Sequence, residues 1–208
     1  MGEPLRFISF EGPEGSGKST QAGRLSVWLR GLGATVTLTH EPGGTALGEE
    51  IRRWLLHCDA DMGPEAEFLL YSADRAEHVR TVLEPALAGG NFVICDRFVD
   101  SSYAYQGYGR GLDLSWLRAV SKKILRVQPS LTFLLDLPPE QGLKRLADRD
   151  RLEGESLEFH RRVRKGYLDL ASTEPGRYVV LNATLPEHEL ARRIQEEVSK
   201  RWPGLSGL

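Results

Sequence analysis

Residues 10–20 read FEGPEGSGKST, and this stretch decides the fold. It follows the apolar run LRFISF (5–10) and precedes a segment whose apolar residues recur at helical spacing, so it joins a strand to a helix. Residues 12–19 fit the pattern G-x-x-x-x-G-K-[ST], which cradles nucleotide phosphates. Glycines allow backbone turns that point successive N–H groups inward, and the following helix adds its positive N-terminal end.

Lys18 and Ser19 carry the chemistry of this loop. In the pattern, the lysine supplies a full positive charge for the β- and γ-phosphates, and the hydroxyl can hold Mg²⁺. We therefore predict that ATP and Mg²⁺ bind here, with ATP contacted by Gly12, Pro13, Glu14, Gly15, Ser16, Gly17, Lys18, Ser19 and Thr20. The alternative is an ordinary glycine-rich turn, which the complete pattern and its flanking strand and helix argue against. The motif alone serves GTPases, motors and kinases equally.

Apolar runs and helical periodicities alternate along the rest of the chain. Short apolar runs predict strands at residues 6–10, 35–39, 92–96, 131–137 and 178–181. The segments between them predict helices, including one that is capped by Asp113 and ends before Pro129. Strands separated by helices form a doubly wound parallel sheet. We therefore predict an α/β fold of the P-loop NTPase type, a three-layer sandwich in which helices cover both faces of a five-stranded parallel sheet.

The composition bounds the class of protein. The chain has 208 residues, of which 40% are hydrophobic, and its net charge is −2. That length suits one compact domain covering residues 1–208, with the densely charged segment at about 145–156 as the one candidate for a mobile subregion. A nucleic-acid surface usually shows a strong basic excess, so we expect no nucleic-acid partner.

The sequence predicts neither a membrane span nor an export signal. No apolar run approaches the roughly 18–20 residues that cross a bilayer. The opening MGEPLRF lacks the long apolar core of a signal peptide, and two cysteines, Cys58 and Cys95, are too few for a disulfide framework. We therefore expect a cytoplasmic protein without a membrane partner.

Asp96 and Arg97 stand at the carboxyl end of a predicted strand, where ligands bind in open α/β sheets. The Arg97 guanidinium can bind a phosphate through two parallel hydrogen bonds, which would orient a phosphoryl acceptor. Asp96 is placed to hold Mg²⁺ or its waters. A rival acid is Asp136, in the run LTFLLDL, but an Asp there more often caps the next helix, and that is the interpretation we favour.

Tyr71 and Arg75 are four residues apart on a predicted helix and therefore share a face. An aromatic ring beside a hydrogen-bond donor suits a nucleobase, with Tyr71 stacking on it and Arg75 bonding a carbonyl. The alternative is core packing for Tyr71 and a surface ion pair for Arg75. The pattern alone does not decide between the two interpretations.

Five stretches of the chain form a specific combination: FEGPEGSGKST (10–20), EPGGTALGEEIR (41–52), LLYSADRAEH (69–78), DRFVDSSYAYQGYGR (96–110) and DRLE (150–153). In these motifs and in their order, the chain resembles thymidylate kinases of the bacterial type. The stretch DRFVDSSYAYQG is highly specific, and EPGGT is nearly so. The resemblance implies that the protein phosphorylates dTMP to dTDP with ATP, on a P-loop kinase fold that usually forms a homodimer.

The resemblance also assigns roles around a predicted acceptor pocket. It implies that dTMP is contacted by Glu14, Glu41, Pro42, Tyr71, Arg75, Arg97, Ser101, Ser102, Tyr105 and Gln106. Within this set, Tyr105 would occupy the space of a ribose 2′-hydroxyl, and Glu14 would contact the 3′-hydroxyl. The alternative for Glu14 is a solvated loop carboxylate. His40 stands where the family commonly has an arginine, and we leave it out of the predicted site.

The charged segment at about 145–156 matches the family's lid, which closes over ATP. The phosphate loop has Gly15 where the eukaryotic type of the family places an arginine, so lid arginines would supply the missing positive charge. The predicted catalytic residues are Lys18, Arg97, Arg149 and Arg151, and the predicted metal ligands are Ser19 and Asp96. By resemblance, Arg145 lies against adenine. The alternative is that the lid arginines are solvated surface charges.

Two other functions stay open at this point. Another nucleoside monophosphate kinase would share the phosphate loop and the lid. A non-catalytic nucleotide-binding regulator would also bind ATP, but a sensor need not retain Lys18, Arg97 and lid arginines together. A panel of phosphoryl acceptors separates the first alternative from dTMP phosphorylation, and an assay of ADP release separates the second.

Overall fold

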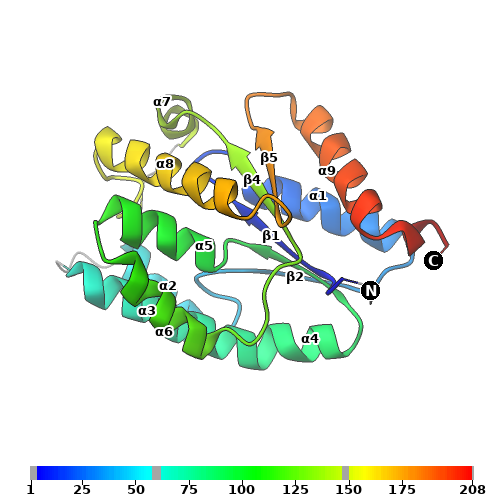
Figure 1. The fold of residues 1–208 in the computed structure, drawn as a ribbon, viewed down its shortest axis with the longest axis horizontal. Coiled ribbons are helices and arrows are strands. Elements are labelled where there is room, and N and C mark those ends of the chain that lie inside the picture. Colours follow the sequence, from blue (N-terminus) through cyan, green and yellow to red (C-terminus); the bar gives the residue numbers. More distant parts are fainter. Residues whose placement is uncertain (1–3, 58–61, 147–149, 208) are drawn as a thin grey trace.

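The computed structural model describes residues 4–57, 62–146 and 150–207, and its centre is a sheet with the strand order β2-β3-β1-β4-β5 (Figure 1). Neighbouring strands are parallel throughout. The strands are β1 (Phe7–Glu11), β2 (Val36–His40), β3 (Phe92–Asp96), β4 (Leu131–Asp136) and β5 (Tyr178–Asn182). Each agrees with a predicted strand to within one residue at either end, so the predicted five-stranded parallel sheet is confirmed.

Helices cover both faces of the sheet and complete the three predicted layers (Figure 1). On one face, α1 (Lys18–Gly31) packs beside α9 (Glu187–Arg201). The other face carries α3 (Pro64–His78), α5 (Val99–Ser102) and α8 (Leu157–Thr173). The remaining helices and helical turns are α2 (Ala46–His57), α4 (Glu84–Ala88), α6 (Leu114–Ile124), α7 (Pro139–Gly142), Val79–Leu83, Tyr103–Gly109, Leu143–Arg145 and Pro203–Gly207.

Alternation along β1 divides the hydrophobic core between the two faces. Ile8 and Phe10 join a cluster with Leu25 of α1 and Ile194 of α9. Phe7 lies in a different cluster, on the opposite face of the sheet. Because both faces are covered, this strand is apolar on both sides, as the sequence pattern predicted. The single charged residue of β1 is Glu11, at its carboxyl end, where the phosphate loop begins.

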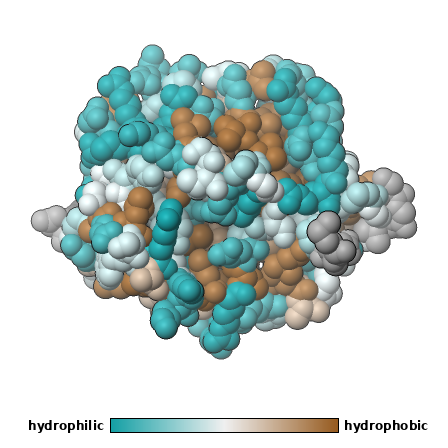
Figure 2. All heavy atoms as spheres, in the orientation of Figure 1, coloured by the Kyte–Doolittle hydropathy of each residue, from teal (hydrophilic) through white to brown (hydrophobic). Residues whose placement is uncertain are grey.

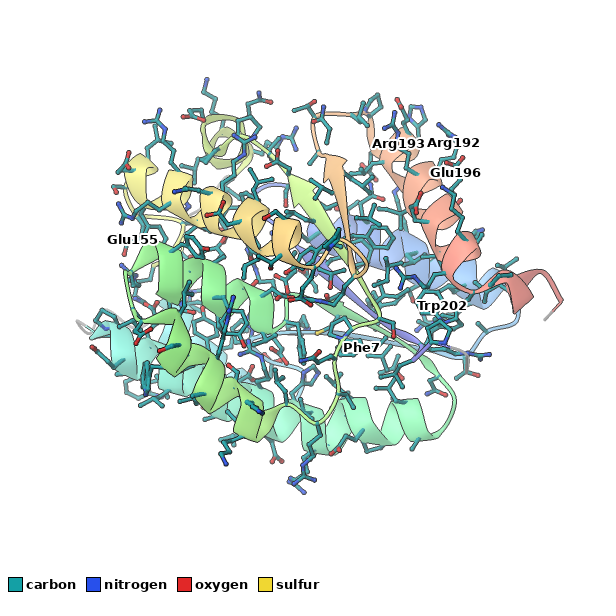
Figure 3. All side chains as sticks on the ribbon, in the orientation of Figure 1. Phe7, Glu155, Arg192, Arg193, Glu196 and Trp202 are labelled. Atoms are coloured by element: carbon teal, nitrogen blue, oxygen red, sulfur yellow. The ribbon has the colours of Figure 1, made fainter. Side chains whose placement is uncertain are left out.

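The outer side of α9 is charged and its inner side is apolar. Figure 3 shows Arg192, Arg193 and Glu196 on the outer side of this helix, and Arg192 pairs with Glu196 one turn away. Trp202, directly after the helix, is 1% exposed and packs edge-on against Phe92, with ring centroids 5.3 Å apart. The amphipathic pattern therefore fixes which side of α9 meets the sheet.

The visible face in Figure 2 is hydrophilic over most of its area. Hydrophobic atoms gather over β5, the edge strand, where Val180 is 48% exposed. None of the helices in the described part of the chain is long and apolar enough to cross a membrane.

Of the two predicted helix caps, one is confirmed and the other is wrong. The Asp113 side chain accepts a hydrogen bond from the Ser115 N–H at 2.7 Å, so the predicted cap of α6 is confirmed, although α6 ends at Ile124, well before Pro129. The cap predicted for Asp136 is wrong. Its two oxygens accept from Nε and Nη2 of Arg164, at 2.7 and 2.8 Å, because α8 brings that guanidinium to the end of β4.

The segment 99–109, which precedes the helix predicted after Asp113, is itself helical. Its serines, tyrosines and glycines are poor helix formers, so tertiary packing must supply the stability. Close contact with α8 does so: a Cβ built on Gly109 would lie 2.6 Å from the Phe159 ring, and one built on Gly166 would lie 2.6 Å from the Tyr108 ring. The two glycines let the helices approach, which no local sequence pattern reveals.

Candidate active site

A cavity of about 830 Å³ opens at the carboxyl ends of β1, β2 and β3. The phosphate loop and the predicted acceptor residues line it together. Of the predicted site residues, its lining includes Glu14, Gly15, Gly17, Lys18, Ser19, Thr20, Glu41, Pro42, Tyr71, Arg75, Asp96, Arg97, Ser101, Ser102, Tyr105, Gln106 and Arg145. Gly12, Pro13 and Ser16 belong to the same loop but are not among the residues that line the cavity. One cavity thus joins residues predicted to bind a donor with residues predicted to bind an acceptor.

The phosphate loop curls around its own lysine. The φ angles of Gly12, Gly15 and Gly17 are 144°, 67° and 87°, values that side chains of other residues rarely allow. Lys18 Nζ donates to the carbonyls of Gly12 at 3.0 Å and of Pro13 at 2.9 Å. Burial, followed by the charge of Arg97, lowers the pKa of Lys18 to about 8. A positive charge thus lies inside the loop at the N-terminus of α1, which suits a phosphate group.

The requirement for glycine at residue 15 has a structural reason that the sequence did not reveal. A Cβ built on it would lie 2.3 Å from the carbonyl oxygen of Gly142, and a Cβ on Gly142 would lie 2.1 Å from the carbonyl oxygen of Glu14. The loop and α7 therefore touch backbone to backbone. Because of this contact, any side chain at residue 15 would force the two segments apart.

Asp96 and Ser19 fit a divalent cation such as Mg²⁺. The Ser19 hydroxyl donates to Oδ2 of Asp96. Oδ1 of Asp96 is buried and has no hydrogen-bond partner among the described residues. A buried carboxylate oxygen beside a hydroxyl is the type of ligand that hard cations prefer. Asp136, the rival acid, is occupied by Arg164.

Arg97 pairs with Glu14 at the base of the cavity. Arg97 Nη2 donates to both oxygens of Glu14, each at 2.7 Å, and Nη1 donates to the Tyr167 hydroxyl at 3.2 Å and to the Gly12 carbonyl at 3.3 Å. Burial alone would raise the pKa of Glu14, but the charges of Arg97 and then Lys18 hold it at about 2. The φ angle of Arg97 is 68°, which costs of order 1 kcal/mol for a residue with a side chain and is typical of functional positions.

The pairing explains why a carboxylate stands among phosphate-binding glycines. Glu14 holds the guanidinium and accepts from the Tyr105 hydroxyl at 2.6 Å. Its side chain is only 14% exposed, so the alternative of a solvated carboxylate does not describe it. The predicted contact with a 3′-hydroxyl stays a prediction.

Tyr71 lines the cavity and is 9% exposed, in a cluster with Tyr105 and Leu152. Tyr105 is 3% exposed, and the Arg97 guanidinium lies 5.1 Å from its ring centroid. These two aromatic rings give the part of the cavity predicted to bind the acceptor flat apolar walls. Such walls suit a nucleobase and a deoxyribose.

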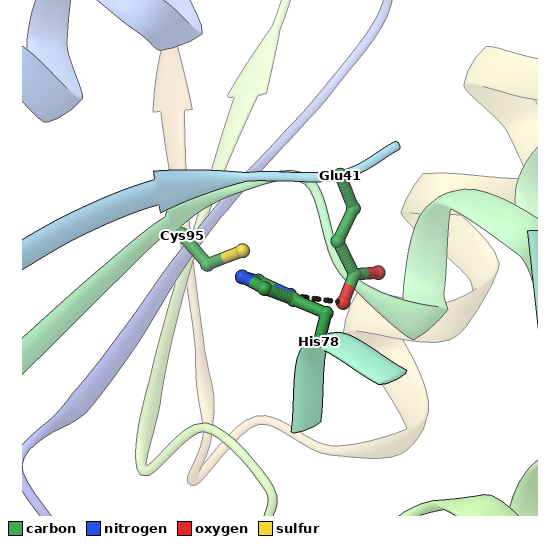
Figure 4. A group of neighbouring side chains, drawn as sticks. All are labelled: Glu41, His78 and Cys95. Carbon is green, nitrogen blue, oxygen red and sulfur yellow. Dashed lines mark hydrogen bonds and ion pairs between the residues drawn. The ribbon is translucent and has the colours of Figure 1, made fainter. Parts of the chain in front are cut away.

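Arg75 is held in a buried network rather than at the surface. It is 2% exposed, and its Nε donates to Oε2 of Glu41 at 2.7 Å, while Nη1 donates to the Ser102 hydroxyl at 3.0 Å. His78 Nδ1 donates to the other Glu41 oxygen at 2.9 Å (Figure 4). Of the two interpretations of Arg75, a surface ion pair is therefore wrong. Bonding to a base carbonyl stays a prediction, in competition with the Glu41 pair.

Cys95 lies beside this network in Figure 4, and ligand atoms of Glu41, His78 and Cys95 fall within 4.8 Å of one another. The arrangement does not suit a metal ion. His78 Nε2 is already 2.7 Å from the Thr39 hydroxyl, so both ring nitrogens have hydrogen-bond partners. Burial also raises the pKa of the Cys95 thiol well above its usual value. We infer that Glu41, His78 and Cys95 are structural and support the loop that follows β2.

Glu11 and Tyr167 belong to the site, although the sequence analysis missed both. Glu11 accepts from the Phe98 N–H at 2.8 Å and from the Ser101 hydroxyl at 2.6 Å. Tyr167 lies 2.7 Å from the same Ser101 hydroxyl. Through these bonds the two residues support both the backbone after Arg97 and the groups around its guanidinium. A charged residue at the end of an apolar strand was the available signal for Glu11; nothing local marked Tyr167.

The raised pKa of the buried Glu11 predicts that the free energy of unfolding depends on pH. Burial, and next the charge of Asp100, raise its pKa from 4.5 to about 8. The folded state therefore binds this proton more tightly, so the stabilising contribution is full below about pH 4.5 and is lost as the pH rises through about 8. We expect the free energy of unfolding to fall by up to about 1.4 kcal/mol per pH unit in this window from this group. Denaturant unfolding of the wild type and of Glu11→Gln measures it, and the variant should show the shallower slope. Equal slopes would contradict the assignment.

The arginines of the predicted lid have separate locations. Arg145 Nη1 donates to the Gly15 carbonyl at 3.0 Å, so Arg145 lies against the phosphate loop. Arg151 pairs with Glu67 at 2.7 Å and donates from Nε to the Leu55 carbonyl at 2.8 Å. It is not among the described residues that line the cavity. Arg149, predicted as catalytic, lies outside the described residues, as does Cys58.

A family model described as thymidylate kinase matches residues 10–194. The chain belongs to the thymidylate kinase family. It is 54% identical over 199 residues to a thymidylate kinase from Deinococcus radiodurans, an alignment covering 94% of this chain and 97% of the relative. A thymidylate kinase from Synechococcus sp. (strain JA-2-3B'a(2-13)) is also 54% identical, over 198 residues that cover 95% of this chain and 96% of the relative. A crystal structure of thymidylate kinase from Ehrlichia chaffeensis superimposes with a TM-score of 0.79 at 34% identity, covering 92% of this chain and 97% of that one. The resemblance read from the motifs and the P-loop kinase fold that it implied are thus confirmed.

Proposed function

We propose that the protein transfers the terminal phosphoryl group of ATP to dTMP and releases dTDP and ADP. The main support for the proposal is one observation: Lys18 of the phosphate loop and Arg97 at the end of β3 line the same cavity. Membership of the thymidylate kinase family supports dTMP as the acceptor.

Catalysis by these residues is positioning and electrostatic stabilisation, without a covalent intermediate. The phosphate loop and Lys18 hold the donor phosphates, and the Arg97 guanidinium orients the acceptor phosphate toward them. Tyr71 and Tyr105 hold the base and sugar so that the acceptor oxygen lies in line with the transferred group. Ser19 and Asp96 would hold Mg²⁺, which neutralises charge on the phosphate oxygens when bound.

An acceptor panel tests the proposal. ADP release is measured with dTMP, dUMP, UMP, CMP and AMP at equal concentrations. We expect dTMP to give the highest kcat/KM. A higher kcat/KM with another nucleotide would favour a different nucleoside monophosphate kinase, and absence of ADP release with every acceptor would favour a nucleotide-binding regulator.

The position of the Tyr105 ring predicts that the protein prefers an acceptor with deoxyribose over one with ribose. Its ring fills the cavity wall beside Arg97, where a ribose 2′-hydroxyl would need space. We expect Tyr105→Ala to raise the activity on ribothymidine monophosphate relative to dTMP by about tenfold or more. Tyr105→Phe keeps the ring and should leave that ratio unchanged, even though it loses the bond to Glu14. A deoxy-to-ribo ratio that stays constant in Tyr105→Ala would remove the steric role.

The proposal also includes a cytoplasmic homodimer, as the resemblance implies. Leu47 and Trp54 lie two turns apart on α2 and are 51% and 57% exposed, and Leu69 on the adjacent α3 is 48% exposed. Exposed apolar side chains on two neighbouring helices support a protein contact there. Light scattering after size exclusion measures the mass, and a monomer at micromolar concentration would contradict the dimer.

A further inference from the structure

Arg151 connects residues 150–153, within the predicted lid segment, to two helices. Its backbone N–H donates to the Leu56 carbonyl at 3.2 Å, and its Nε donates to the Leu55 carbonyl at 2.8 Å, both at the end of α2. Its Nη1 lies 2.7 Å from Oε2 of Glu67, in the first turn of α3. One side chain thus joins residues 150–153 to both α2 and α3.

Glu67 is the centre of this contact. Its side chain is 0% exposed, and besides Arg151 its oxygens accept from Gln106 Nε2 at 2.8 Å and from Arg110 Nη2 at 3.2 Å. Arg110 in turn pairs with Glu155 at 2.5 Å, and Figure 3 labels Glu155 near the N-terminal end of α8. The segment 150–156 is therefore attached to the buried carboxylate twice, directly through Arg151 and indirectly through Arg110.

Residues on both sides of Arg151 line the cavity, whereas Arg151 itself is not among the lining residues. Asp150, Leu152 and Glu153 line the cavity, together with Leu56 of α2. Leu152 is 6% exposed and belongs to the apolar cluster that contains Leu56, Tyr71 and Tyr105. The contacts of Arg151 thus hold Leu152 against the aromatic rings on the acceptor side.

We propose that Arg151 is a positioning residue for the acceptor nucleotide, acting through Glu67 to hold the 150–153 segment as a wall of the dTMP pocket. The inference rests on the proposed function, because it takes the space beside Tyr71 and Tyr105 as the dTMP pocket. It replaces the role predicted from the sequence, in which Arg151 meets charge on the transferring phosphoryl group.

The two roles predict opposite kinetics. A residue that shapes the acceptor pocket affects dTMP binding, so its loss raises the KM for dTMP. A residue that meets transition-state charge lowers kcat with little change in KM. The variants to compare are Arg151→Gln, Glu67→Gln and the double variant, with Arg192→Gln as a control that removes an exposed arginine–glutamate pair on α9.

We expect Arg151→Gln to raise the KM for dTMP about tenfold, since close charged pairs couple by amounts of this order, with kcat and the KM for ATP within about twofold of wild type. Glu67→Gln should raise the same KM. The double variant should be no worse than the worse single variant, because the two residues act as one unit. Arg192→Gln should match wild type.

Two outcomes would overturn the inference: an unchanged dTMP KM, whether or not kcat falls, or additive effects of the two substitutions. If Arg151→Gln does not fold, Arg151→Lys decides: one ammonium group cannot serve both Glu67 and the Leu55 carbonyl as the guanidinium does, so the dTMP KM must still rise. Wild-type turnover is measured first. Failure of the wild type to phosphorylate dTMP would contradict the proposed function, whereas normal wild-type turnover with either of the two outcomes contradicts the role of Arg151 alone.

Discussion

Lys18→Met should abolish phosphoryl transfer and leave the fold intact. Lys18 places a full charge inside the phosphate loop, where it contacts the Gly12 and Pro13 carbonyls. Removing one preorganised donor to a transition state costs about 10²–10³-fold in turnover, and loss of a full charge on the transferring group can cost more. We therefore expect a fall in kcat of at least about 10³-fold, measured by ADP release with dTMP.

The stability of Lys18→Met separates a catalytic from a structural effect. Burial lowers the pKa of Lys18 to about 8, which means that the folded state disfavours its charge. Replacing it by an apolar side chain of similar length removes this cost but also removes the bonds to the Gly12 and Pro13 carbonyls, so the thermal midpoint should change little. Turnover close to wild type would contradict the role of the loop, and unfolding of the variant would contradict the account of the lysine's burial.

Arg97→Lys should lose most activity toward dTMP while ATP binding persists. The guanidinium uses two separate groups: Nη2 bonds both oxygens of Glu14, and Nη1 bonds Gly12 and Tyr167. One ammonium group cannot serve both sets of partners and also bind an acceptor phosphate through two parallel bonds. We expect kcat/KM for dTMP to fall by about 10²-fold or more.

Calorimetric titration of the same variant with ATP provides the control. The dissociation constant for ATP should stay within about threefold of wild type, because differences smaller than that correspond to well under 1 kcal/mol. If ATP affinity fell and the KM for dTMP held, Arg97 would belong to the donor side, and the division of the cavity into donor and acceptor halves would be wrong.

The sheet and the phosphate loop could be predicted from the sequence because their signals are local. Each buried strand is a short apolar run, and the loop needs its glycines and Lys18 at fixed spacing. The same holds for Asp113, whose capping contact involves a residue two positions away. Local physical chemistry decides these features, so one sequence is sufficient to read them.

Contacts between segments far apart in the sequence could not be predicted. Gly15 was read as a missing cation, but the structure gives it a steric reason in Gly142. The helix at 99–109 forms because glycines let it approach α8, and its own composition argues against it. In both cases a small residue permits a close approach whose partner is visible only in the fold.

The partners of charged side chains were the least predictable part of the site. The sequence alone does not distinguish Arg75, Arg145 and Arg151. In the structure, Arg75 forms a buried ion pair with Glu41 and Arg151 pairs with Glu67. Arg145 instead donates to the Gly15 carbonyl. A guanidinium bonds any nearby carboxylate or carbonyl. Its role therefore depends on which acceptors the fold brings near, and the charged segment itself carries no such information.

The central claim is that donor and acceptor meet in one cavity and that the acceptor is dTMP. Phosphorus NMR of the wild type with ATP, Mg²⁺ and dTMP tests it most directly, since it identifies both products. The account predicts that dTDP and ADP form in equal amounts and that neither forms at a comparable rate without dTMP. Formation of ADP and free phosphate without dTDP, or an absence of turnover, would contradict it.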